Sequence, residues 1–206
     1  MIVELNVKHL TQFDPIWMDV EMPDMKGVGV FGTYAAQGCV EIVDAMVASY
    51  LTGKQRRPSQ KYDLWNDKII AKASSHNLAY SKIDQQLTFN NIAKAIDNGE
   101  VVDIGFFFTG KADYGYTAEY FSPKYNVGGE DTELEWSRHQ VLASGYLMVD
   151  GKIVDIILQD PAERDHNKTV YLSYYLATHK NRYGNDVSFG SWDGITAYKK
   201  PALLGL

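Results

Sequence analysis

The first periodic pattern along the chain predicts a helix. Between Gly38 and Leu51, apolar residues recur at helical spacing, beginning with Cys39, and this places them on one face of an α-helix. Gly53, directly after this run, is a typical residue for a helix end. Weaker helical spacing returns at residues 54–75 and in Phe89–Asn98. We therefore predict that the first half is mainly helical.

The second half of the chain has a different pattern. Apolar, β-rich runs occupy Val101–Phe108, His139–Val149 and Lys152–Leu158. The last two runs are joined by Asp150-Gly151, and Asp-Gly between two such runs is a strong hairpin signal. A further strand is predicted at Thr169–Leu176. Helices followed by antiparallel strands indicate an α+β fold.

The domain organisation follows from length and composition. The chain has 206 residues, 45% hydrophobic and 22% charged, which is an ordinary globular composition. We expect one domain over residues 1–206. The segment at about 110–136, rich in tyrosine, glycine and acids, is too long for a hairpin loop. It is either a functional insertion that borders the active-site cleft or a decorated surface loop.

Charge and hydropathy exclude several classes of partner. Twenty basic and 26 acidic residues give a net charge of −6, so we expect no nucleic-acid partner. No apolar run approaches the length that spans a bilayer, and the N-terminus lacks the pattern of a signal peptide. We therefore expect no membrane association. The protein is predicted to act in the cytoplasm, or to reach a target cell by a non-Sec route.

The single cysteine excludes an intramolecular disulfide and a cysteine-rich metal site. The histidines outside the second-half hairpin share no ligand-like spacing, so we expect no metal site and interpret them as surface residues. They are His9, His76, His166 and His179.

Cys39 itself has two interpretations. It is predicted to lie at the start of its helix, where unpaired N–H groups and the helix dipole favour an anion and make a thiol a better nucleophile. A small, buried core residue is the alternative interpretation.

The predicted hairpin supplies two possible partners for this thiol. With the turn at Asp150-Gly151, residue 139 lies nearly opposite residue 160 or 162, so His139 and Asp160 meet at the same end. A carboxylate that holds one ring nitrogen leaves the other to face a thiol. This is the arrangement of nucleophile, base and orienting acid.

Two segments carry a family resemblance. YAAQGCVEIVDAMVASYL resembles the nucleophile helix of papain-like cysteine peptidases, and RHQVLASGYLMVDGKIVDIILQDP is similar to their histidine hairpin. The likeness is nearest to the bacterial branch of double-glycine leader peptidases and effector proteases, and it covers about a third of the chain. It implies a papain-like fold, with a cysteine helix packed on an antiparallel sheet. It also implies that Cys39 is the nucleophile, His139 the acid and base, and Asp160 the orienting residue.

The sequence departs from the family pattern at two places. The family has an oxyanion-stabilising glutamine about six residues before the cysteine, where this chain has Thr33, and the nearest glutamine is Gln37. Val40 stands where relatives often have glycine or alanine.

The predicted function is a cysteine peptidase that hydrolyses peptide bonds of a peptide or protein substrate and requires no cofactor. Trp136, Tyr114 and Tyr116 are candidate walls of the substrate cleft. Four alternatives stay open: a glutamine deamidase, a peptidoglycan amidase or endopeptidase, a transglutaminase-like enzyme, and a catalytically inactive binding module with the same fold.

Overall fold

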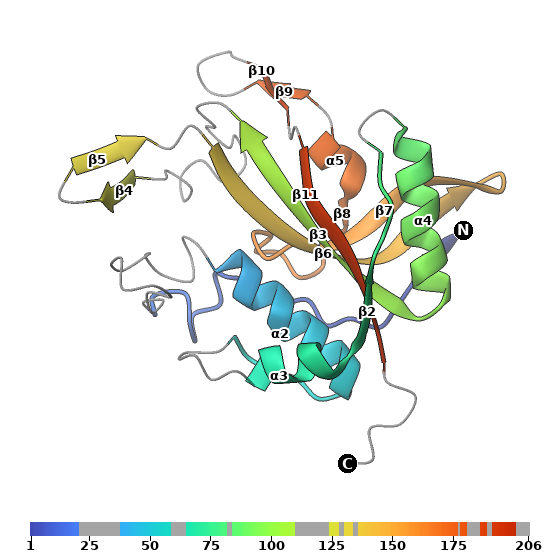
Figure 1. Ribbon diagram of the computed structural model, residues 1–206, viewed down its shortest axis with the longest axis horizontal. Helices are drawn as coiled ribbons and strands as arrows, with labels where there is room; N and C mark the ends of the chain where they lie inside the picture. The colour runs from blue at the N-terminus through green and yellow to red at the C-terminus, as the bar shows by residue number, and fades with distance from the viewer. Residues whose placement is uncertain are drawn as a thin grey trace.

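The fold is described from a computed structural model of the chain, shown in Figure 1. The residues whose placement the structure describes are 1–20, 38–58, 65–81, 84–109, 124–127, 130–133, 136–176, 178–180, 186–188 and 191–200.

The architecture is α+β, with a large antiparallel sheet and a few helices. Within the described residues, seven strands form the main sheet: β1 (Ile2–Glu4), β2 (Ser74–Asn77), β3 (Glu100–Thr109), β6 (Trp136–Val149), β7 (Lys152–Gln159), β8 (Val170–Tyr171) and β11 (Ser191–Lys199). Their order is β2-β11-β3-β6-β7-β8, and β1 pairs with β6 beside this path. All the pairings are antiparallel.

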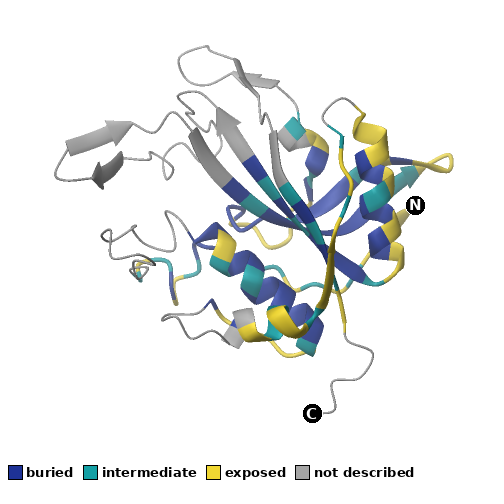
Figure 2. Ribbon diagram, in the orientation of Figure 1, coloured by how far each residue is buried: buried dark blue, intermediate teal, exposed yellow. Residues whose placement is uncertain are grey.

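Helices cover both faces of this sheet. The helices among the described residues are α2 (Cys39–Thr52), α3 (Trp65–Lys72), α4 (Gln85–Asp97) and α5 (Leu172–Leu176). Side chains of α4 pack with Val102, Ile104 and Phe106 of β3, whereas α2 packs with Val101 of the same strand. Because alternate residues of a strand point to opposite faces, α2 and α4 lie on opposite sides of the sheet (Figure 1). Figure 2 shows the central strands and the inner side of α2 buried, with exposed residues on the outer sides of the helices.

Sequence and structure agree on the two elements that matter most for the site. Helix α2 begins at Cys39, and Gly53 ends it in the left-handed conformation with φ of 67°. The turn between β6 and β7 has φ of 48° at Asp150 and 76° at Gly151. These positive angles are what a tight two-residue hairpin requires, so the predicted helix and hairpin are confirmed.

Other elements differ from the prediction. The strand predicted over Thr169–Leu176 is wrong beyond Tyr171, because the chain turns there into α5. Asp155 of β7 accepts a hydrogen bond from the Ser173 backbone N–H, 3.0 Å long, which satisfies a donor in the first turn of this helix. Helix α4 starts before the predicted Phe89, because the Asp84 side chain caps it by accepting from the N–H of Leu87.

The long segment between β3 and β6 leaves the main sheet and returns to it at neighbouring positions. Thr109 at the end of β3 pairs with Trp136 at the start of β6. Between them lies a short hairpin of β4 (Lys124–Val127) and β5 (Glu130–Glu133), and another pair, β9 (Thr178–Lys180) with β10 (Asp186–Ser188), follows α5. Residues 110–123 lie outside the described part of the chain.

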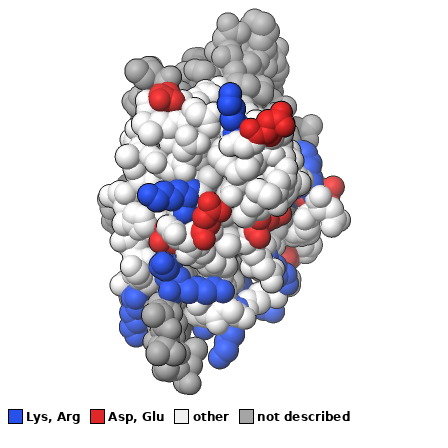
Figure 3. All heavy atoms as spheres, turned by 90° about the vertical axis from the view of Figure 1, so that its right-hand side faces the viewer, with Lys and Arg blue, Asp and Glu red and all other residues white. Residues whose placement is uncertain are grey.

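None of the helices among the described residues has the length and apolar character needed to cross a membrane. On the face drawn in Figure 3, the basic and acidic side chains of the described residues lie interspersed over a largely uncharged surface.

Candidate active site

Helix α2 places the thiol. Cys39 is the first residue of the helix, and Gly38 stands at the N-cap without a side chain to occupy the end. The first helical bond is made by the N–H of Ile42, which donates to the carbonyl of Gly38 at 3.0 Å. The Cys39 side chain therefore sits at the end of the helix where N–H groups lack intrahelical acceptors and the dipole favours negative charge.

The β6–β7 hairpin places the imidazole and the carboxylate. His139 lies in β6, and Asp160 directly follows β7. The Nε2 atom of His139 lies 2.9 Å from Oδ1 of Asp160. A carboxylate oxygen accepts, so Nε2 carries the proton. The same Oδ1 accepts a second bond, 2.8 Å long, from the backbone N–H of Ala162, which ties the carboxylate to its own turn.

The two neighbours of His139 determine its charge. Burial alone would lower the pKa of this imidazole, but the Asp160 charge and hydrogen bond, together with a hydrogen bond and charge interaction from Cys39, raise the pKa to about 10. The Cys39 side chain thus lies beside the ring that Asp160 holds. The structure brings together three side chains that are far apart in sequence, and it favours an imidazolium between a carboxylate and a thiol.

The site is nearly closed to solvent. The exposed fraction is 6% for Cys39, 7% for His139 and 1% for Asp160. A substrate carbonyl therefore has little exposed sulfur to approach. In its burial, Cys39 matches the alternative interpretation of this residue as a small buried side chain.

Residues near the N-terminus hold the turn that carries the acid. The carbonyl of Pro161 accepts from the Thr11 hydroxyl at 3.0 Å and from the N–H of Gln12 at 2.9 Å. The carbonyl of Asp160 lies 2.7 Å from Nε2 of His9. These contacts join the start of the chain to the end of β7.

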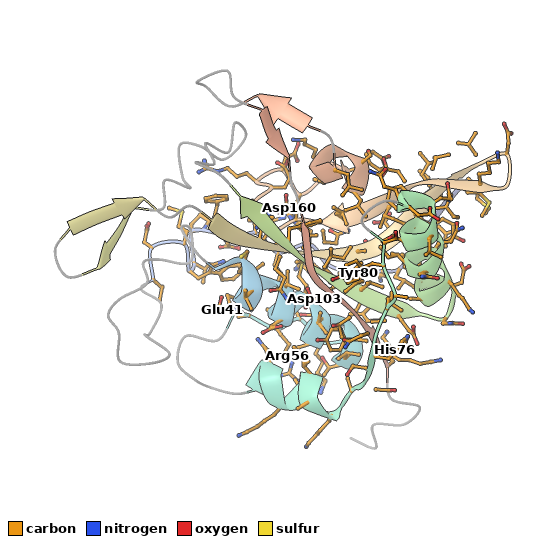
Figure 4. The ribbon with its side chains drawn as sticks, turned by 45° about the horizontal axis from the view of Figure 1, so that its top comes forward. Glu41, Arg56, His76, Tyr80, Asp103 and Asp160 are labelled. Atoms are coloured by element: carbon orange, nitrogen blue, oxygen red, sulfur yellow. The ribbon has the colours of Figure 1, made fainter. Side chains whose placement is uncertain are left out.

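A second polar group lies under α2. The side chain of Asp103 in β3 accepts a 2.5 Å hydrogen bond from Gln140, the residue after His139. Its other oxygen, Oδ1, is sealed from solvent and has no partner among the described residues. Burial raises the pKa of Asp103 to about 7, although the bond from Gln140 opposes this shift. In Figure 4, Asp103 lies beside α2 and Glu41 lies at the first turn of that helix.

Nearby, burial raises the pKa of Tyr198 to about 12, and the charges of Asp103 and Asp44 add to this increase. The α2 side of the sheet therefore carries two further ionisable groups, the Asp103 carboxyl and the half-buried Tyr198 hydroxyl.

Most of the other site residues predicted from the sequence lie outside the described part of the chain. Gln37, Tyr114 and Tyr116 lie outside the described residues, as does Thr33. Trp136 is the first residue of β6 and lies three positions before His139 in the sequence. Among the described residues there is no group of three or more potential ligands that could hold a metal ion.

Sequence reasoning missed one feature of the site. His9 and His166, expected to be unrelated surface residues, contact each other through their Nδ1 atoms at 2.9 Å. They are 157 positions apart, so no spacing pattern could have joined them. An available signal was that His166 follows the proposed acid by six positions, in the same turn.

Comparison with known proteins does not name a family. No protein-family model matches the chain, and no curated protein matches its sequence.

Proposed function

We propose that the protein is a papain-like cysteine peptidase, in which Cys39, His139 and Asp160 hydrolyse a peptide bond through a thioester. The observation that carries the proposal is the buried His139 ring, which lies 2.9 Å from the Asp160 carboxylate and beside the Cys39 side chain at the start of α2. A nucleophile beside a base whose other side is held by an acid is the minimum machinery for thiol-mediated acyl transfer.

The proposed reaction has two steps. The Cys39 sulfur attacks the carbonyl carbon, the C–N bond breaks, and the His139 imidazolium gives its proton to the departing nitrogen. Water then attacks the thioester and gives a proton to His139, and the C–S bond breaks to release the carboxylic acid and restore the Cys39 thiolate beside the His139 imidazolium. The backbone N–H of Cys39, at the helix N-terminus, is positioned to donate to the oxyanion in both steps.

The papain-like assignment is supported by the arrangement of two elements: helix α2 carries the cysteine, and the β6–β7 hairpin supplies the histidine and the acid. The two sequence segments that resemble this superfamily also support it. The antiparallel sheet, with β6 at its centre and β7 beside it, is consistent with this assignment.

The low exposure of the site favours a second candidate, a glutamine deamidase with the same three residues. A slim side-chain amide reaches a nearly closed thiol more readily than an extended main chain does. In this reaction ammonia takes the place of the departing peptide amine, and the steps are otherwise the same.

A peptide-library digest tests the proposal and separates the two candidates. Incubation with the protein should produce new peptide termini, detected by mass spectrometry, whereas a deamidase would release ammonia and leave every chain intact. Cys39→Ala should abolish either activity. Ser49→Ala is the matched control, because Ser49 lies buried in the same helix and its hydroxyl bonds the Ala45 carbonyl. Full activity in Cys39→Ala would refute the proposal.

A further inference from the structure

We propose that His9 is a positioning residue for the acid of the triad, and that His166 fixes the tautomer in which His9 does this. The inference rests on the proposed function, because it assigns roles to residues that act through Asp160. It concerns two histidines that do not touch Cys39 or His139 in the contacts described above.

The first step is the direction of the hydrogen bond to Asp160. The acceptor, 2.7 Å from Nε2 of His9, is a backbone carbonyl. A carbonyl oxygen only accepts, so Nε2 of His9 must carry a proton. The backbone N–H of Glu163 donates to the same carbonyl at 3.0 Å. Two donors therefore fix the carbonyl of the residue whose side chain orients His139.

The second step concerns the other nitrogen of His9. Nδ1 of His9 and Nδ1 of His166 are 2.9 Å apart, with the rings close to perpendicular at 66°. One proton lies between two nitrogens at hydrogen-bond distance. When His9 is neutral with its proton on Nε2, Nδ1 is an acceptor, and His166 must donate to it.

The charges around His9 favour its neutral state. Burial lowers the pKa of His9, and His166 lowers it further; the hydrogen bond to the Asp160 carbonyl and the charges of Asp160 and Glu163 oppose the shift without reversing it. Glu163 itself pairs with Lys168 at 2.7 Å. The resulting sequence of contacts runs from His166 to His9, to the Asp160 backbone, and through its carboxylate to His139.

Not every contact on this turn has the same consequence. The Thr11 hydroxyl bonds the next carbonyl along, that of Pro161, and so holds the turn without holding the residue that orients the imidazole. Thr11→Val is therefore the matched control for a lost hydrogen bond to this turn.

The test uses the reactivity of the single cysteine. The measured quantity is the rate of Cys39 alkylation by iodoacetamide at pH 6 divided by the rate at pH 9. This ratio reports the charge pair with His139 and does not depend on the amount of folded protein. In His9→Phe this ratio should fall about tenfold, because small displacements of a positioned group have large effects on rate. His9→Gln places an amide N–H near the position of Nε2 and should restore most of the ratio. His9→Asn places it near Nδ1 and should not, and Thr11→Val should leave the ratio unchanged.

The outcomes separate this inference from the proposed function. If wild-type Cys39 reacts as an ordinary thiol, losing about tenfold in rate for each pH unit below its titration, the proposed function fails and the positioning role fails with it. If wild-type Cys39 reacts at pH 6 but His9→Phe and His9→Asn keep the wild-type ratio, only the positioning role is overturned.

Nitrogen NMR of the wild-type protein decides the tautomer even if a variant does not fold. We expect His9 to carry its proton on Nε2 at pH 7. A proton on Nδ1 alone would contradict the inference.

Discussion

The two faces of the central sheet differ in what they bury. The α4 face packs a cluster made entirely of hydrophobic side chains, among them Ile92, Ile104 and Phe106. The α2 side also has an apolar cluster, but Cys39 lies at the start of α2, and the Asp103 carboxyl beneath the helix has one oxygen with no hydrogen-bond partner among the described residues. Burying a polar or charged group costs free energy unless it is hydrogen-bonded. The apolar cluster under α4 therefore stabilises the fold, whereas burial of the Asp103 carboxyl on the α2 side lowers its stability.

The largest expected effect belongs to the proposed active site. His139→Ala should reduce turnover by roughly a thousandfold or more, because the acid and base of both steps is lost. Circular dichroism should show the fold retained, with a lower melting temperature, because the buried Asp160 carboxylate loses its partner. A folded variant with near wild-type turnover would remove His139 from the mechanism.

The next effect belongs to the apolar side. Ile104 is fully buried under α4, and Ile104→Ala should lower the free energy of unfolding by about 2–5 kcal/mol, because it leaves a cavity. Urea denaturation measures this loss. The alkylation rate of Cys39 per folded molecule should stay unchanged. A loss of thiol reactivity without a loss of stability would show that the two faces are not separate in function.

A smaller effect is expected at the acid. Asp160→Asn should lower kcat roughly 10–100-fold, less than His139→Ala, because an amide oxygen still accepts from Nε2 if the amide is oriented correctly. Asp160→Ala, which leaves the imidazole without an acceptor, should be more severe than Asp160→Asn. Equal, full activity in both would mean that another residue orients the ring.

The smallest expected effect is on how the stability of the protein depends on pH, and it arises from Asp103. Its pKa is raised from 3.8 to about 7 in the folded protein, so between these values the unfolded chain loses a proton that the folded protein keeps. Stability therefore falls as pH rises through this range. Asp103→Asn cannot ionise, so its stability relative to wild type should improve from pH 4 to pH 8, by at least about 1 kcal/mol. Thermal melts at the two pH values measure this difference, and a difference that does not depend on pH would contradict it.

Local signals were enough to predict the elements that hold Cys39, His139 and Asp160. Helical spacing ended by Gly53 predicted α2, and Asp150-Gly151 predicted the hairpin turn and, through its register, the meeting of His139 with Asp160. These predictions succeeded because a helix end and a two-residue turn are determined by a few neighbouring residues.

Features that depend on distant contacts could not be predicted in the same way. Helix α5 begins where Asp155, 18 positions earlier, accepts from Ser173. The contact between His9 and His166 arises only because the N-terminal segment lies across the turn after β7. No periodicity within either segment encodes such contacts, since they depend on how the elements pack.

The most direct test of the triad is a titration of the His139 ring by nitrogen NMR. Burial alone would lower the pKa of this imidazole below its ordinary 6.5, whereas the carboxylate of Asp160 and the thiol of Cys39 raise it to about 10. We predict that both ring nitrogens of His139 stay protonated at pH 8 in the wild-type protein, and that this signature is lost at pH 8 in a Cys39→Ala, Asp160→Asn double variant. A wild-type His139 that is neutral at pH 8, with a titration at or below 6.5, would contradict a charged pair between this imidazole and Cys39.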